Sequence, residues 1–274
     1  DFTFFVSFFP QLVAGPIVRA KDFIPQIYKK VSLTKEETAQ ALFLIIGGLL
    51  KKAVISDYIS INFVDRVFDA PSSYTSFENL LAVYGYALQI YCDFSGYSDI
   101  AIGLALLMGF TLPENFRTPY QSINITEFWH RWHISLSTWL KDYLYIPLGG
   151  NRQGSFWGYF FPTLFFIATL SWAFMQGGES LVPLFITLGV IILFEVSILL
   201  SPDKAKALRS HFNQLTTMLL GGLWHGANLR FIIWGALHGL ALSFHKSFKE
   251  IFPDKTPTKR SFLRGIVALI SVMV

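Results

Sequence analysis

Long apolar runs separated by short polar connections constrain this chain more than any other feature. Residues 156–176 and 181–200 are each long enough to cross a bilayer, which takes about 20 helical residues. Further apolar runs cover residues 38–55, 77–91, 100–112, 216–239 and 240–252. Inside lipid, only helices and closed barrels satisfy every backbone group. Because 53% of the residues are hydrophobic and only 15% are charged, these runs predict an all-α, polytopic integral membrane protein.

Polar interruptions within these runs leave some local structure open. Residues 2–18 are apolar but broken by two prolines and a glycine, so they predict a short or re-entrant segment. The Lys51-Lys52 pair within residues 38–55 is expected to snorkel to a membrane interface. The stretch CDFSGYSD, residues 92–99, forms either an ordinary interfacial loop or a polar surface facing the bundle interior or a water-filled cavity.

The charge pattern also favours a membrane protein. The formal net charge of +4 does not indicate a nucleic-acid partner, because the basic residues lie in short clusters between apolar runs. The positive-inside rule expects this of cytoplasmic loops and helix ends. The single cysteine, Cys92, excludes an internal disulfide and a cysteine-rich metal site. Since the chain starts at Asp1 without a methionine and stops at Val274 within an apolar run, we expect it to be the central piece of a longer protein.

Residues 127–145 predict an amphipathic helix lying in the membrane interface. Three tryptophans and His133 fall on one aromatic face at helical spacing, whereas Ser135 falls elsewhere and His130 groups with a wetter side. A proline followed by two glycines ends this helix. His130 and His133 are close enough to share a metal ion, but no cysteine or carboxylate at a recognised ligand spacing completes a site. We therefore predict no metal.

His225 is the ionisable residue that most needs an explanation. It lies within the apolar run 216–239, where an ionisable side chain costs a few kcal/mol and is by default a functional hypothesis. Glycines at 221, 222 and 226 suit a site where backbone or substrate approaches closely. The alternative is a histidine that simply hydrogen-bonds a neighbouring residue.

Three long motifs carry a family resemblance. They are QIYCDFSGYSDIAIGLALLMGF, then PENFRTPYQSINITEFWHRWHISLSTWLKDYLYIPLGGNR, then MLLGGLWHGAN. In this order they resemble the membrane-bound O-acyltransferase family, in particular its bacterial branch with the alginate O-acetyltransferase membrane subunit and the D-alanyl transfer protein of teichoic acids. The resemblance implies a helical membrane bundle with interfacial and re-entrant helices. It also implies that His225, in WHG, is the catalytic residue and that His133, in RWHIS, is a second polar residue at the reaction centre.

The implied activity is acyl transfer, most simply acetyl transfer, from a cytoplasmic thioester donor to a hydroxyl. The donor would be acetyl-CoA or an acylated carrier protein, as a co-substrate and not a bound cofactor. The acceptor would be an extracytoplasmic polysaccharide or a partner protein, with an extracytoplasmic acyltransferase often completing the transfer. These features imply a multi-pass protein of the bacterial cytoplasmic (inner) membrane.

The chemistry that this reaction needs fits the histidines. A base must take the hydroxyl proton, and a neutral imidazole suits that role. We assign His225 as general base, with His133 polarising the carbonyl or orienting the acceptor. His238 is interpreted as structural, because an unbroken helix would turn it roughly 220° away from His225.

Two departures from the family pattern concern His130, where the family often has arginine, and the interval between RWHIS and WHG. This interval is roughly twice the one expected. We therefore expect a single domain over residues 1–274, in which residues 155–213 are an inserted transmembrane hairpin and a polar connector. Glu195, within the second arm, is expected to be a packing or interfacial carboxylate.

Other functions stay open. Transfer of D-alanyl or another acyl group to a cell-wall polymer needs the same residues. A polysaccharide transporter or channel also uses broken helices and intramembrane polar residues, and a non-catalytic scaffold of an export complex would tolerate loss of His225. Measured acyl transfer separates the enzyme from both, whereas flux without a donor favours transport.

Overall fold

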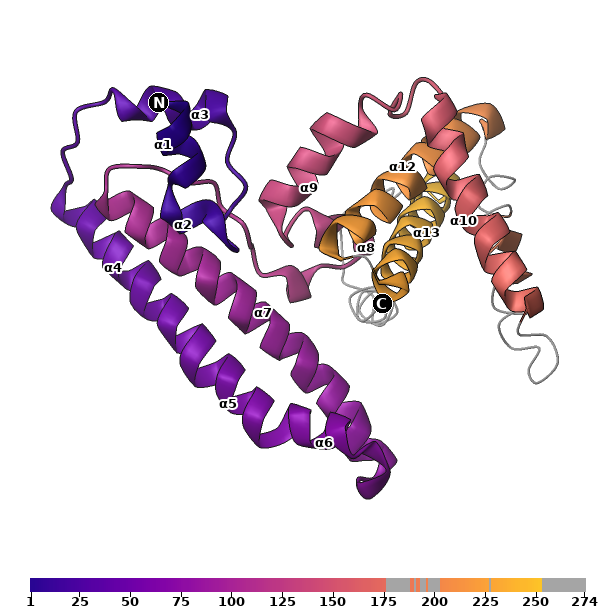
Figure 1. Ribbon diagram of the computed structural model, residues 1–274, viewed down its shortest axis with the longest axis horizontal. Coiled ribbons are helices and arrows are strands. Elements are labelled where there is room, and N and C mark those ends of the chain that lie inside the picture. Colours follow the sequence, from indigo (N-terminus) through magenta and orange to yellow (C-terminus); the bar gives the residue numbers. More distant parts are fainter. Residues whose placement is uncertain (176–187, 190, 193–195, 197–202, 227, 253–274) are drawn as a thin grey trace. The chain divides into compact units, whose positions relative to one another are not determined.

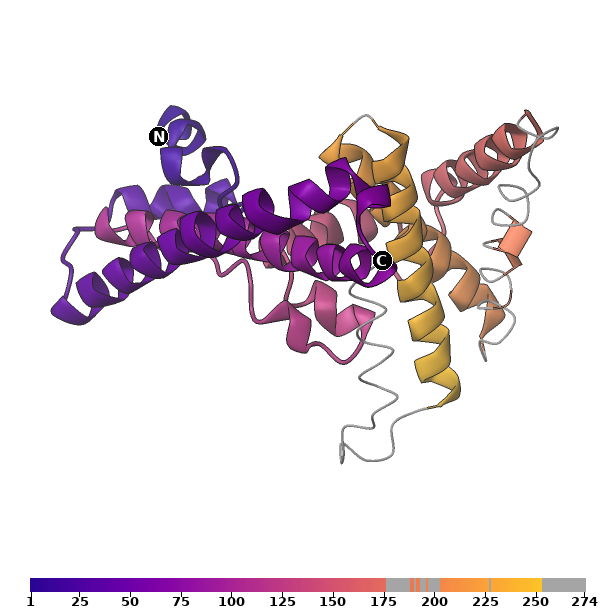
Figure 2. The same cartoon turned by 90° about the horizontal axis from the view of Figure 1, so that it is seen from below.

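The computed structural model describes residues 1–175, 188–189, 191–192, 196, 203–226 and 228–252. It divides into two compact units. Unit 1 comprises Asp1–Arg117 and Arg131–Leu136, and unit 2 comprises Thr118–His130 and Ser137–Val274. Every regular element among the described residues is helical (Figures 1 and 2), which confirms the predicted all-α class.

Unit 1 is built on two long helices that run side by side (Figure 1). The first, Lys35–Asp69, consists of α4 (Lys35–Leu49), η1 (Leu50–Ser56), α5 (Asp57–Ile59), η2 (Ser60–Val64) and α6 (Asp65–Asp69), and η1 and η2 are π-helical. The second is α7 (Ser76–Leu107), reached through the 3₁₀ turn η3 (Pro71–Ser73). Both are long and apolar enough to cross a membrane. Each begins with a capping box, formed by Thr34 with Glu37 and by Thr75 with Glu78.

The two helices meet along a stripe of residues spaced by four: Gly48, Lys52, Ser56, Ser60 and Val64. On α7, Gly48 contacts Gly96, Lys52 pairs with Asp93, and Val64 contacts Gly85. Ser56 and Ser60 both form hydrogen bonds with Gln89. Four residues of α-helix turn through about 400°, so such a stripe would drift by about 40° at each step. The π-helical turns, with their i→i+5 bonds, take more residues per turn and offset that drift.

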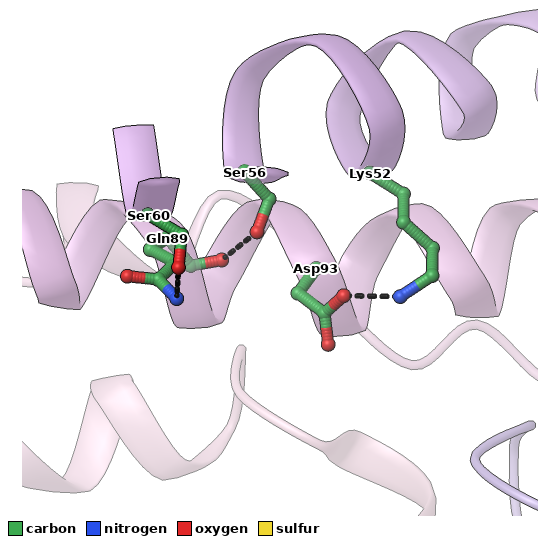
Figure 3. A network of polar contacts seen from close by, with 5 residues as sticks. All are labelled: Lys52, Ser56, Ser60, Gln89 and Asp93. Atoms are coloured by element: carbon green, nitrogen blue, oxygen red, sulfur yellow. Dashed lines mark hydrogen bonds and ion pairs between the residues drawn. The ribbon is translucent and has the colours of Figure 1, made fainter. Parts of the chain in front are cut away.

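Residues 92–99 do not form a loop but continue α7, so the interpretation as an interfacial loop was wrong. Asp93 and Asp99 are matched by lysines: Lys52 pairs with Asp93 (Figure 3), and the Nζ of Lys51 lies 2.6 Å from the Oδ2 of Asp99. Both lysines are thus paired with carboxylates of α7, and their snorkelling to a membrane interface stays a prediction. The helix continues because its charged groups have partners on the neighbouring helix.

The N-terminal segment forms three short helices, α1 (Phe2–Ser7), α2 (Phe9–Leu12) and α3 (Ala20–Ile27), which confirms that residues 2–18 are not a continuous span. Phe8 and Phe23 pack with Phe110, their ring centroids 4.8–4.9 Å apart. Ala105 and Leu112 complete this buried core of unit 1.

The predicted helix 127–145 is broken, so its single aromatic face was wrong. The structure has α8 (Ile125–Trp129), α9 (Ile134–Leu140) and the π-helical η5 (Lys141–Tyr145), with non-helical residues between α8 and α9. His133 has a φ of +43°, in the left-handed region that ends regular helices. Asn115 then receives the first backbone N–H groups of α9, from Ile134 (2.9 Å) and Ser135 (3.3 Å). The chain therefore starts a new helix instead of continuing the old one.

Unit 2 is built on α10 (Phe156–Met175), α12 (Lys204–His225) and α13 (Leu229–Ile251). Helices α12 and α13 pack closely, because Gly222 and Gly235 leave room for the backbone of the partner helix. Helix α10 packs against α12, where the Oγ1 of Thr216 donates a 2.8 Å hydrogen bond to the carbonyl of Gly158. The second hairpin arm with Glu195 lies outside the described residues, apart from isolated positions.

Candidate active site

His225 is the last residue of α12, and the next helix, α13, begins at Leu229. It therefore does not share a helix with His238, so the reason given for separating the two was wrong. The N-cap of α13 is Asn228, whose side chain accepts a 3.0 Å hydrogen bond from the backbone N–H of Arg230.

Aromatic rings surround the imidazole of His225. Its ring centroid lies 5.1 Å from that of Trp224, 5.2 Å from that of Trp234 and 6.2 Å from that of Phe231. The side chain is exposed within unit 2. Over residues 203–226 and 228–252, no hydrogen bond to either ring nitrogen of His225 is formed. Among the described residues, the ring is thus contacted by aromatic side chains and by no hydrogen-bond partner.

His238 also packs against Trp234, at a ring-centroid distance of 4.6 Å. It is buried, and its Nδ1 accepts a 3.3 Å hydrogen bond from the indole Nε1–H of Trp129. Because the Nδ1 of His238 accepts this hydrogen bond, it carries no proton. These contacts support the interpretation of His238 as a structural side chain.

His133 lies in unit 1 and is only 4% exposed. Its Nδ1 is 3.1 Å from the Oδ1 of Asn115, which also accepts a 2.8 Å hydrogen bond from the Oγ of Ser135. Because a carbonyl oxygen only accepts, Nδ1 of His133 carries the proton and the lone pair of the neutral ring lies on Nε2. Phe94 packs edge-on against the imidazole at 4.6 Å.

Asn115, Ser98 and Ser135 form a buried network around His133 that sequence reasoning missed. The Nδ2 of Asn115 donates a 3.1 Å hydrogen bond to the Oγ of Ser98, and the Oγ of Ser135 accepts a 2.9 Å hydrogen bond from the backbone N–H of Ile17. Ser135 was expected on a different helix face from His133, but both side chains form hydrogen bonds with the Oδ1 of Asn115. The available signal was Asn115 itself, a polar residue within the PENFRTP segment of the second motif.

The two candidate histidines belong to different units, His133 to unit 1 and His225 to unit 2. Each therefore has a defined environment of its own. As for metals, no group of three His, Cys, Asp or Glu side chains that could hold an ion occurs in the described part of the chain. His130 is exposed.

Known proteins similar to this chain are named as enzymes that transfer acetyl or D-alanyl groups. The chain is 39% identical over 247 residues to "Probable alginate O-acetylase AlgI" of Pseudomonas putida, which covers 90% of this chain and 40% of the relative. It is 38% identical over 252 residues to the peptidoglycan O-acetyltransferase of Helicobacter pylori, covering 91% of this chain and 38% of the relative. It is 29% identical over 251 residues to the teichoic acid D-alanyltransferase of Bacillus subtilis, covering 90% of this chain and 51% of the relative. The chain thus spans about two-fifths to half the length of these relatives.

A family-wide comparison covers most of the chain as well. The model of the membrane-bound O-acyltransferase family matches residues 1–176 and 199–274. Both candidate histidines and all three sequence motifs lie within that match. On this evidence, the chain belongs to the membrane-bound O-acyltransferase family.

Proposed function

We propose that this chain is the membrane domain of an O-acyltransferase that moves an acyl group, most simply acetyl, from a cytoplasmic thioester to a hydroxyl. The single observation that carries the proposal is His225, an imidazole held by aromatic rings at a helix break, with no hydrogen bond to it within the described residues. A general base needs this combination of a fixed ring and an open nitrogen. Relatives named as O-acetyltransferases support the reaction class.

In this mechanism, His225 takes the proton of the acceptor hydroxyl as the oxygen attacks the thioester carbonyl. The new carbon–oxygen bond forms, the carbon–sulfur bond breaks, and the departing thiolate takes the proton from His225. His133 polarises the carbonyl or orients the acceptor. Its ring is suited to a fixed role, because Asn115 sets which nitrogen carries the proton.

The proposed setting is a multi-pass helical domain of a bacterial cytoplasmic (inner) membrane, with interfacial and re-entrant helices. The two long apolar helices of unit 1 and the membrane-bound family support it. Within a single domain over residues 1–274, residues 155–213 remain a proposed hairpin insert, and the family match leaves out residues 177–198 of that interval. With Cys92 replaced, cysteines placed at 155 and 203 should label from the same side of the membrane, and opposite sides would contradict the insert.

The proposed donor is acetyl-CoA or an acylated carrier protein. The proposed acceptor is an extracytoplasmic polysaccharide or a partner acyltransferase that completes the transfer. Transfer of D-alanyl to a cell-wall polymer is the second candidate, favoured by the similarity to a teichoic acid D-alanyltransferase.

The test is turnover by the purified full-length protein in lipid nanodiscs. Acetyl-CoA, an acetylated carrier protein and a D-alanylated carrier protein are supplied in separate arms, each with polysaccharide and with cell-wall polymer acceptors. Thiol release and acylated product are both followed. Acylated product that depends on one donor supports the enzyme. Polysaccharide flux across vesicles without any donor, and without acyl transfer, would favour the transporter.

A further inference from the structure

The indole of Trp234 contacts both the exposed His225 and the buried interior of unit 2. Its ring centroid lies 5.2 Å from that of His225, and the two ring planes are 84° apart. It also lies 4.6 Å from the ring of His238 and 5.8 Å from the indole of Trp129. These last two side chains are only 3% and 8% exposed. Trp234 therefore joins an exposed ring at the end of α12 to two buried ones.

Trp129 has a fixed position on α13. It comes from α8, which packs against α13. The indole Nε1–H of Trp129 bonds the Nδ1 of His238, as described above. One helical turn earlier, the Oγ1 of Thr126 lies 2.9 Å from the Nδ1 of His245. Two side-chain contacts thus hold α8 on α13, and Trp234 packs against a ring that they keep in place.

His225 has no polar neighbour that sets the direction of its ring. A catalytic base is usually oriented by a third, hydrogen-bonded group, and none bonds His225 in the described part of the chain. The torsion that turns a histidine ring has broad minima, so the imidazole rotates easily unless its neighbours restrain it. Edge-to-face ring contacts supply such a restraint, because ring quadrupoles favour that geometry.

Among the three rings around His225, Trp234 is the best placed to restrain it. Trp224 is 59% exposed and directly precedes His225 in the chain. Phe231 is 41% exposed, and its centroid is the most distant of the three, at 6.2 Å. Trp234 is half-buried and rests on two buried rings. A neighbour that is itself held can fix the direction of the imidazole.

We propose that Trp234 is a positioning residue that keeps the imidazole of His225 in one orientation, with Trp129 holding Trp234 in turn. This inference rests on the proposed role of His225 as general base. In that role, the nitrogen lone pair must meet the acceptor hydroxyl within hydrogen-bond reach. A ring that turns freely spends only part of its time there. Loss of Trp234 should therefore slow the chemical step and leave donor binding unchanged.

The test combines ring spectroscopy with kinetics on the purified full-length protein in nanodiscs. Isotope-labelled histidine gives ring signals by nuclear magnetic resonance, and the signal absent from His225→Ala belongs to His225. Trp234→Leu should broaden or split that signal. It should also lower kcat by about tenfold at unchanged KM, with whichever of acetyl-CoA, acetylated carrier and D-alanylated carrier protein supports turnover. Trp234→Phe restores a ring and should keep one signal and most of kcat.

Trp157→Leu is the matched control. It removes an exposed indole of the same unit, whose ring contacts among the described residues are with Phe156, Phe160 and Phe161. Both the His225 signal and kcat should stay as in the unmodified protein. A second ring-free variant, Trp234→Met, fills more of the space, so the test stands even where Trp234→Leu does not fold.

Two results would overturn the inference: one sharp His225 signal in the folded ring-free variant, or equal loss of kcat in Trp234→Phe and Trp234→Leu. A disordered His225 ring with full turnover would have a different meaning. It would uphold the contact between the two rings and contradict the role of His225 as base. Because the spectroscopic measurement needs no turnover, failure of the positioning role and failure of the proposed function are told apart.

Discussion

Two lysines and a histidine in unit 1 differ from His225 in unit 2 in how their polar atoms are partnered. In unit 1, Lys51 and Lys52 are matched by carboxylates of α7, and His133 is matched by Asn115. In unit 2, His225 has aromatic neighbours in place of hydrogen bonds within the described residues. Matched groups hold a structure together, whereas unmatched groups are available to bind or to react. The difference predicts that substitutions at Lys51, Lys52 and Asn115 act on stability and position, and those at His225 on chemistry.

The largest effect is expected at His225, an unmatched group. His225→Ala removes the general base, which usually costs about 10² to 10⁴ in rate. The variant should still insert and fold, because the contacts of the lost ring with the described residues are packing contacts at an exposed helix end. Thioester consumption and acylated product from purified protein measure the loss.

His238→Ala is the control for this change, since His238 is buried and bonded to Trp129. It should keep much of the turnover at some cost in stability. Near-normal turnover of His225→Ala would contradict the proposal that His225 is the general base and would favour the scaffold and transporter alternatives.

The next largest effect on turnover is expected at Asn115, which accepts a hydrogen bond from His133. Asn115→Leu removes the acceptor that selects the protonated ring nitrogen and should lower turnover by about tenfold, the value of one buried hydrogen bond. Asn115→Asp keeps an acceptor at that position and should retain most of the activity. If the two variants are equally impaired while equally stable, His133 is not positioned through Asn115.

A stability effect is expected at the matched lysines. The Lys51 and Asp99 side chains are 33% and 23% exposed, so Asp99→Asn should cost about 2 kcal/mol of unfolding free energy, between a surface and a buried pair. Asp93→Asn should cost less, about 1 kcal/mol or below, because the Lys52 and Asp93 side chains are 40% and 49% exposed. Denaturant unfolding of the full-length protein in detergent measures both.

Replacing both partners sharpens this test. Lys51→Met combined with Asp99→Leu should recover most of the lost stability, since it leaves no charge unmatched. A double variant less stable than Asp99→Asn alone would mean that the pair contributes more than charge matching.

The smallest effect is expected at the helix starts, which lie outside the comparison. Thr34→Ala and Thr75→Ala each remove one capping box and should cost about 1 kcal/mol, while the corresponding serine variants cost little. Turnover should not change in either case. A change in turnover would show that the ends of the long helices contribute to the reaction.

Local sequence patterns predicted the helical class and the interrupted N-terminal segment, because apolar length and prolines act locally. They failed where a distant residue decides the structure. The polar residues 92–99 continue a helix because lysines about 40 residues earlier neutralise their carboxylates. Likewise, the period of residues 127–145 runs on through His133, and only Asn115, 18 residues before it, explains why the helix breaks there.

For the candidate site, the sequence indicated His225 and His133 but not what surrounds them. The aromatic rings around His225 come from the same apolar run, so part of its environment could be predicted from the sequence. The network of Ser98, Asn115 and Ser135 joins segments that no single periodicity connects. Its members become visible only when those segments are folded together.

The π-helical turn η1 makes the first long helix more sensitive to its length than to its side chains. If η1 relaxed to ordinary α-helix without losing a residue, everything beyond it would rotate by about 100°, the angle of one residue. Gly48 would keep its contact with α7, while Ser56, Ser60 and Val64 would lose theirs together. A one-residue deletion between Leu50 and Ser56 should therefore keep these contacts, because it removes the residue that the π-helical turn accommodates, whereas a one-residue insertion should undo them together.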